Sequence, residues 1–210
     1  MVVEQVQGNP YPETTVRIKP KQTPLSDNND LVDTWLKTSG VNTLRPKLEI
    51  SGDTYSAISV IQEAPTMPVG STELRPHRMA VGLYDLSGST LKLRKSVELD
   101  VAGALTEVKE LAGEKVADLL LLNDRDLSYG KIRFDDRSIA TLKSHLGKLD
   151  DGLARALCWS AAWDMLRDAE ISATDFVEIA IAGMPGESDI TIVTMLIAQL
   201  STAVELYASE

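Results

Sequence analysis

The sequence has very little cysteine and histidine, and this scarcity limits the chemistry available to it. Its single cysteine, Cys158, cannot form an internal disulfide bond, which is typical of proteins in the reducing cytoplasm. Cys158 lies in an apolar run, so we expect a buried and unreactive thiol. The two histidines, His77 and His145, do not form a His-Glu-x-x-His pair. Because catalytic zinc needs three protein ligands around an open position, we expect no metal site and no cofactor in this chain.

The chain also lacks a basic and apolar leader at its amino terminus, and it has no long apolar run. Its longest apolar stretch, Ile190 to Leu200, is interrupted by polar residues and is shorter than the roughly 20 residues of a membrane-spanning helix. The formal net charge is -10, of which residues 151–210 contribute -8 through two basic and ten acidic side chains. So acidic a surface repels phosphate groups. We therefore expect a soluble, cytoplasmic protein whose partners include neither a membrane nor a nucleic acid.

No catalytic motif is visible in the sequence. There is no Gly-x-Ser-x-Gly elbow, and Ser87-Gly88-Ser89 is typical of a hairpin turn. The stretch Gly183–Gly186 lacks the Lys-Ser/Thr ending of a phosphate loop. Four carboxylates could in principle hold calcium, namely Asp124, Asp126, Asp135 and Asp136. They lack the glycine and the distal glutamate of a calcium loop, so we expect turns and helix caps instead. The predicted set of catalytic, cofactor-binding and metal-binding residues is therefore empty.

Four zones follow one another along the chain. Residues 1–25 contain four prolines and little apolar periodicity, which predicts an extended arm or linker. Residues 26–44 combine capping residues with helical spacing, which predicts a short helix over about 27–39 and then a junction. The hydrophobic period then changes twice. It predicts a β-sandwich domain over residues 45–134 and an α-helical domain over residues 135–210.

The period-two pattern of the third zone predicts about seven short strands. We expect them at residues 48–50, 55–62, 79–84, 91–93, 97–101, 117–122 and 132–134. Val97, Leu99 and Val101 alternate with charged residues, as in a half-buried antiparallel strand. Short strands separated by regular turns are typical of a β-sandwich. The continuous apolar run Leu119–Leu122 is expected to be its most buried strand.

From residue 135 the apolar residues recur at helical spacing. We expect four helices, the last of which extends to about Ala208. Their predicted starts are Asp135 or Asp136, Asp150-Asp151, Ser172, and Ser188 or Asp189. Trp159 and Trp163 lie four residues apart, which favours packing against a neighbouring helix over a ligand platform. The predicted fold class is a β-sandwich followed by an all-α, helical-repeat-like segment, which makes an α+β protein with segregated parts.

Four segments resemble one known family more closely than the fold alone requires. Trp35–Pro46 is similar to the junction that precedes its β-sandwich, and Leu74–Asp85 to a strand of that sandwich. Leu121–Arg133 resembles the end of the sandwich, and Arg155–Glu170 the opening helices of the carboxy-terminal domain. The family is that of aminopeptidase N, the zinc metallo-aminopeptidases, in its bacterial form. The resemblance covers residues 30–210 in the correct order.

The resemblance implies a β-spacer domain followed by the first helices of a superhelical cap, which closes over the family's catalytic cleft and limits access to short peptides. The family's zinc ligands, its Gly-Ala-Met-Glu-Asn motif and its transition-state tyrosine have no counterpart in this sequence. It therefore implies a truncated, non-catalytic part of an enzyme that removes N-terminal amino acids from peptides, with zinc and peptides bound only in the full-length protein. The alternatives are a freestanding protein-interaction module and an enzyme with an unfamiliar site.

Residues 190–207 are expected to form an interaction surface. Their apolar side chains do not make a single stripe, and the helix lacks the polar outer face of a terminal repeat. Exposed apolar patches tend to be buried by association. The predicted partners are a second copy bound through residues 190–207, or a separate catalytic half. The alternative is that the arm of residues 1–25 folds back over the patch.

Overall fold

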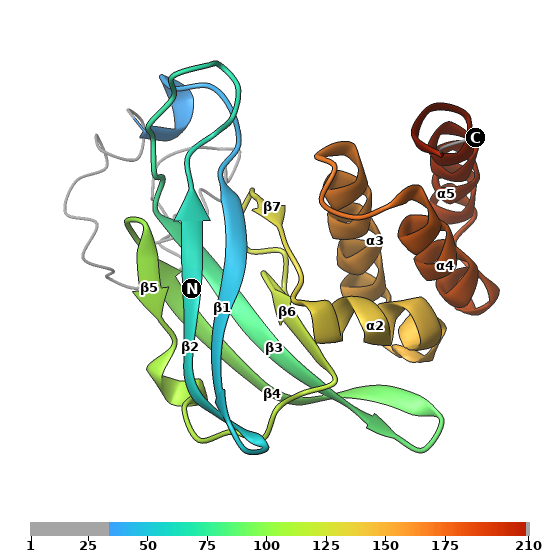
Figure 1. Ribbon diagram of the computed structural model, residues 1–210, viewed down its shortest axis with the longest axis horizontal. Coiled ribbons are helices and arrows are strands. Elements are labelled where there is room, and N and C mark those ends of the chain that lie inside the picture. Colours follow the sequence, from blue (N-terminus) through green and yellow to red (C-terminus); the bar gives the residue numbers. More distant parts are fainter. Residues whose placement is uncertain (1–33, 209–210) are drawn as a thin grey trace, which may run out of the picture. The chain divides into compact units, whose positions relative to one another are not determined.

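The computed structural model describes residues 34–208, and the apolar runs after Asn42 form strands in two sheets (Figure 1). The larger sheet has the strand order β5-β2-β1-β7, and the smaller one has the order β4-β3-β6. The strands are β1 Thr43–Ser51, β2 Thr54–Glu63, β3 His77–Ser87, β4 Thr90–Val101, β5 Leu105–Glu107, β6 Leu119–Leu122 and β7 Lys131–Ile132. The two sheets confirm the predicted β-sandwich, although β1 to β4, with 9 to 12 residues each, are longer than the short strands that the pattern predicted.

Most neighbouring strands are antiparallel, but β7 joins β1 in parallel, so that Leu44 lies opposite Ile132. The pattern predicted two strands within β4, yet β4 is continuous. The register of β3 and β4 shifts at Leu83/Tyr84, and Arg94 is the additional residue. This bulge breaks the apolar alternation without ending the strand. The three-residue strand β5, which pairs with β2, was not predicted because it is too short to show a period.

Strand β6 is buried along its whole length, as its continuous apolar sequence predicted. Each of its four leucines is at most 1% exposed. One side of the strand pairs with β3, and the backbone N–H of Leu120 donates to Ser138 Oγ at 3.0 Å from the following helix. A strand covered on both faces has no position for a polar side chain, which explains why its sequence does not alternate.

The helices follow the sandwich in the order α2 Asp136–His145, α3 Gly152–Arg167, α4 Ala173–Gly183 and α5 Ile190–Thr202, with a π-helical turn at Ala203–Tyr207. Their predicted caps are confirmed. The carboxylates of Asp135, Asp151 and Asp189 each accept from two backbone N–H groups of the first turn. Ser172 and Asp175 form a reciprocal capping box at the start of α4. The confirmed fold class is a β-sandwich followed by an α-helical segment.

One continuous hydrophobic core joins the strands to the helices. The helices lie on the side of the sheets that carries β6 and β7 (Figure 1). The contacts divide the chain into two compact units, residues 1–38 and residues 39–210. In the first unit residues 34–36 are helical, while the arm and most of the short helix predicted over 27–39 lie outside the described residues. The domain boundary at residue 134 and the helical-repeat character of the second part remain predictions.

The burial of β6 and α3 leads to a stability prediction. Leu120→Asp places a carboxylate at a side chain that is 1% exposed, and Trp159→Ala empties a site that is fully buried. We expect each change to lower the free energy of unfolding by about 3–5 kcal/mol. Leu105→Asp and Leu153→Ala are matched controls at side chains that are 55% and 47% exposed, and should cost about 1 kcal/mol or less. Equal midpoints of urea denaturation for a core variant and its control would show that the core is misassigned.

Candidate functional site

The histidines and the cysteine lie in structural positions. His77 is buried at the start of β3, and its Nδ1 lies 2.6 Å from Ser128 Oγ. Burial, reinforced by the charge of Arg75, lowers the pKa of His77 to about 4. His145 is the last residue of α2 and is partly buried. Cys158 is fully buried, as expected, and this burial raises the pKa of its thiol.

The four carboxylates that were considered for calcium have separate roles. Asp135 caps α2, Asp136 lies in its first turn, and Asp126 occupies a left-handed turn position with φ 52°. Asp124 differs from the expected turn residue, because it is buried and accepts a hydrogen bond from the Tyr84 hydroxyl. Burial raises the pKa of the Asp124 carboxyl. Among residues 34–208, no three His, Cys, Asp or Glu side chains are grouped so that they could hold a metal ion.

A cluster of ion pairs lies between the sandwich and the end of α3. Arg133, which follows β7, has a side chain that is only 1% exposed. Its Nε lies 2.6 Å from Glu170 Oε1, and its Nη2 bonds the carboxylate of Asp168. Two further cations complete the cluster: Arg45 Nη1 lies 2.7 Å from Glu170 Oε2, and Lys131 Nζ lies 2.7 Å from Asp168 Oδ2. We call these five residues the junction cluster.

Local backbone geometry brings the two carboxylates to Arg133. Helix α3 ends in a Schellman motif, in which Glu170 N–H donates to Met165 O at 2.8 Å and Ala169 N–H to Leu166 O at 3.0 Å. Ala169 takes the left-handed conformation at φ 60° that this motif requires. The turn places the side chains on either side of Ala169 toward the sandwich. On the other side, pairing of β7 with β1 sets Arg133 beside Arg45.

A groove of about 560 Å³ lies next to the junction cluster. One wall is a stripe along α3, and the other is the segment between β6 and β7. The walls contribute both apolar and charged side chains, among them Leu153, Leu157, Asp164 and Arg167 from α3. The groove therefore combines an apolar surface with an acidic and a basic side chain, Asp164 and Arg167. Asp126 in the opposing wall was considered only as a calcium ligand, and the four residues from α3 were not singled out, because the two walls are more than twenty residues apart along the chain.

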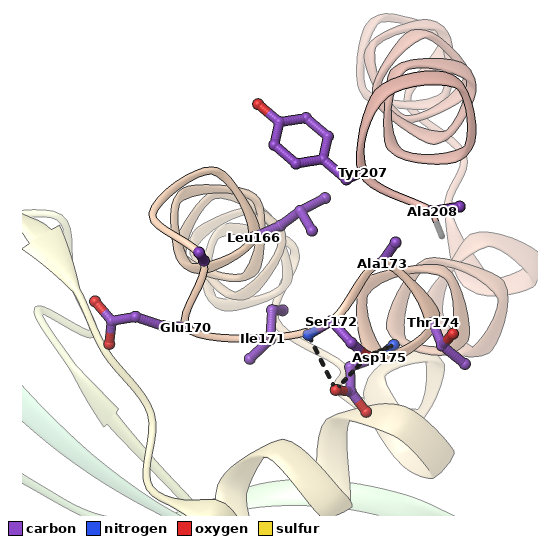
Figure 2. A pocket seen from close by; sticks show the side chains of 10 residues that line it. Leu166, Glu170, Ile171, Ser172, Ala173, Thr174, Asp175, Tyr207 and Ala208 are labelled. Atoms are coloured by element: carbon purple, nitrogen blue, oxygen red, sulfur yellow. Dashed lines mark hydrogen bonds between the residues drawn. The ribbon is translucent and has the colours of Figure 1, made fainter. Parts of the chain in front are cut away.

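A second hollow, of about 550 Å³, lies beside the turn between α3 and α4. Figure 2 shows Leu166, Tyr207 and the capping box around it. The carboxylate of Asp175 accepts from the backbone N–H and the hydroxyl of Ser172 at 3.2 and 2.7 Å. Since a carboxylate already occupies the amino-terminal turn of α4, this hollow does not favour an anion.

Comparison with known proteins identifies the family. Residues 119–210 match the family model of the ERAP1-like C-terminal domain. Over 180 residues the chain is 46% identical to an aminopeptidase N from Streptomyces lividans, and the match covers 83% of the chain and 21% of that relative. The chain belongs to the aminopeptidase N family. It spans about a fifth of the length of the relative that it matches.

The segments that resemble the aminopeptidase N family also contain the charged residues of the junction cluster. Leu121–Arg133 and Arg155–Glu170 supply Arg133, Asp168 and Glu170, so both halves of the junction cluster come from the resembling segments. The zinc of the aminopeptidase N family would need a set of ligands that residues 34–208 do not bring together. Residues 34–208 therefore do not fit a zinc site. It remains a prediction that this chain holds no cofactor.

Within residues 34–208, one helix meets the length and composition of a short membrane span. It covers Ile190–Tyr207, and 11% of it is buried. The sequence pattern predicted that the last helix extends to about Ala208, and α5 with its π-helical turn runs to Tyr207, as predicted. A single helix of this kind is weak evidence for a membrane protein.

The junction cluster predicts an acid-sensitive contribution to stability. In Arg133→Met the two carboxylates lose their shared cation but remain partly exposed and keep Lys131 and Arg45. We therefore expect a loss of about 1–3 kcal/mol at pH 7, which is less than for a fully buried pair. Arg125→Met is the matched control, since Arg125 is 55% exposed and pairs with Glu98 at the surface.

The sign of the pH dependence follows from the carboxylates. Burial alone would raise the pKa of Asp168 and Glu170, but the hydrogen bonds from Lys131, Arg45 and Arg133 outweigh it, so both pKa values lie below the ordinary range. Their contribution is present above about pH 4.5 and is lost as the pH falls through the lowered folded-state values. The difference in unfolding free energy between wild type and Arg133→Met should therefore shrink between pH 7 and pH 3. A difference that stays constant over this range would contradict the assignment.

Proposed function

We propose that this chain is a non-catalytic part of a zinc aminopeptidase, the class of enzyme that removes N-terminal amino acids from peptides. In that role it spaces and lines the substrate chamber. The observation that carries the proposal is the junction cluster, which ties the first long helix to the sandwich through a buried guanidinium. A charged cluster of this kind fixes the orientation of two layers more strictly than apolar contact does, because each donor needs a partner in one direction.

The proposal includes a cytoplasmic location and excludes membranes and nucleic acids as partners. Its support is the formal charge of -10 and the single, buried cysteine. Peptides and zinc would be bound only in the complete enzyme. The aminopeptidase N of Streptomyces lividans, which is 46% identical over the matched region, offers a complete protein in which this can be measured.

The test replaces the matched region of the Streptomyces lividans enzyme with the corresponding residues of this chain. We expect the chimera to hold zinc and to hydrolyse both an aminoacyl arylamide and a peptide of about ten residues. Introducing Arg133→Met should raise the KM for the peptide by about threefold to tenfold, since the chamber wall shifts while zinc and arylamide hydrolysis are retained. Arg125→Met serves as the charge-matched control and should leave both substrates unaffected.

Two outcomes would contradict the architectural role. One is a folded Arg133→Met chimera with the kinetic constants of its parent for both substrates. The other is arylamide hydrolysis with bound zinc in this chain alone, measured by metal analysis and activity on the same preparation. The second outcome would place the catalytic site within this chain.

A second candidate function, a protein-interaction module, has support from α5 and its π-helical turn. Four large apolar side chains there are more than half exposed, namely Ile190, Ile197, Val204 and Leu206. No charged residue occurs from Ile190 to Val204. Two copies could therefore pair along this face without bringing like charges together, although residues 151–210 carry a formal charge of -8.

For this module we predict self-association through residues 190–207. Wild-type chain should sediment faster than a 22.9 kDa monomer, whereas a Met195→Lys, Leu206→Lys double variant should sediment as a monomer. These side chains are 41% and 74% exposed, so the substitutions should leave the fold intact. A Ser89→Lys, Ser144→Lys variant adds the same charge at exposed positions elsewhere and should behave as wild type. A monomeric wild type at about 100 μM would exclude the dimer as a stable species.

A further inference from the structure

Helix α5 and its π-helical turn are attached to the other helices along one narrow line. The side chains that pack into the core recur at intervals of three or four residues, namely Ile192, Leu196, Leu200 and Ala203. Only 11% of the segment Ile190–Tyr207 is buried. Because packing of an apolar face supplies most of the stability of a helix, a segment with so little buried surface has a low local stability. We call residues 190–207 the strap.

An ion pair holds the base of the strap. Glu187 Oε2 lies 3.5 Å from Nε of Arg155, near the start of α3. The side chain of Glu187 is 4% exposed and that of Arg155 is 13% exposed, so both charged groups are largely withdrawn from water. The second carboxylate oxygen of Glu187 accepts from the backbone N–H groups of Ser188 and Asp189 at 2.9 and 3.0 Å. The carboxylate of Glu187 therefore joins the start of the strap to α3.

The backbone just before Glu187 indicates where the strap can turn. A Cβ atom at Gly186 would lie 2.9 Å from the carbonyl oxygen of Gly147, so Gly186 is in close contact with the turn that follows α2. This contact holds Gly186 in place, whereas Glu187 is held by its own side chain. The hinge therefore lies between Gly186 and Glu187, and turning there separates Glu187 from Arg155.

Aromatic contacts hold the far end of the strap. The ring of Tyr207 lies edge-on to Trp163 of α3, with centroids 6.5 Å apart, and Trp163 packs against Phe176 of α4 at 5.3 Å. Tyr207 also lines the hollow of about 550 Å³ (Figure 2). Between the two ends, Gln199 Oε1 is buried and accepts no hydrogen bond from the residues that the structure describes. Such an oxygen favours the undocked strap, in which water donates to it.

We propose that the strap is a gate, which turns between Gly186 and Glu187 and leaves α3 and α4 as one unit while the sandwich and α2 to α4 stay folded. The contact of Glu187 with Arg155 and that of Tyr207 with Trp163 set how often it opens. Opening uncovers Trp163 and removes Tyr207 from the wall of the hollow, so the docked strap keeps this apolar surface covered. The inference rests on contacts within the chain and depends neither on the architectural role nor on self-association.

Hydrogen exchange of the whole chain, followed by mass spectrometry, tests the gate. We expect the amides of residues 193–206 to exchange at least about 100-fold faster than those of residues 158–166 in α3. Glu187→Gln keeps an oxygen that can accept from Ser188 and Asp189 but removes the charge that faces Arg155. It should speed exchange of the strap about threefold to tenfold and leave α2 to α4 unchanged. Glu178→Gln is the matched control, since Glu178 pairs with Lys143 and should leave the strap unchanged.

The far end of the strap is tested in the same way. Tyr207→Ala should speed exchange of the strap about threefold to tenfold, whereas Leu206→Ala, at a side chain that is 74% exposed, should not. A protein concentration of about 5 μM keeps the contribution of self-association small. Exchange of the strap as slow as that of α3 would overturn the proposal, because the strap would then open only when the whole chain unfolds. Equal acceleration of all four helices by Glu187→Gln would overturn it for the same reason.

Discussion

The structure depends on the need of one buried guanidinium for carboxylate partners. Arg133 cannot lose its charge, and its side chain is almost completely removed from water. The desolvation of such a cation is offset only where anions meet it with good geometry. Asp168 and Glu170 meet this condition, and they do so only because α3 ends where it does and turns at Ala169. The position of the first long helix is thus tied to the last strand of the sandwich.

Within the sandwich, other buried polar groups also need hydrogen-bond partners. Arg75 donates to Asn42 Oδ1 at 3.0 Å, and Asn42 Nδ2 donates in turn to the carbonyl groups of Glu63 and Glu73 at 3.1 and 2.6 Å. These bonds hold the chain before β1 against the connection between β2 and β3. The Asp124 carboxylate, bonded by Tyr84, lies over Gly82, where a Cβ atom would come within 2.7 Å of its Cγ. Hence glycine is needed at this position of β3 for a steric reason.

The helical part presents two surfaces with different chemistry. The groove along α3 combines the aliphatic side chains of Leu153 and Leu157 with acidic and basic ones, and hydrogen bonds within one wall hold its backbone turn. The face of α5 is apolar and carries no charge before Glu205. The second surface favours a broad apolar partner, because it offers area but few directional contacts.

Local sequence determined the elements of this protein. Strand β6 could be predicted because four consecutive leucines in a sandwich form a buried strand. The helix starts could be predicted because each helix is capped by a residue next to it in the sequence, namely Asp135, Asp151, Ser172 and Asp189. These effects act over a few residues, so the sequence contains them directly. The bulge at Arg94 and the short strand β5 were missed, since both depend on the neighbouring strand.

Tertiary structure alone decided the sites. The role of Asp124 as a buried partner of Tyr84, the junction cluster and the groove each join residues at least 35 positions apart or from separate elements. Arg133, Asp168 and Glu170 look like ordinary surface charges in the sequence, and they were notable only through a family resemblance. Burial and partner geometry give a charged residue its role, and both arise only when distant segments pack together. The sequence therefore determined where strands and helices form, whereas the packing of β7 against α3 determined which charges matter.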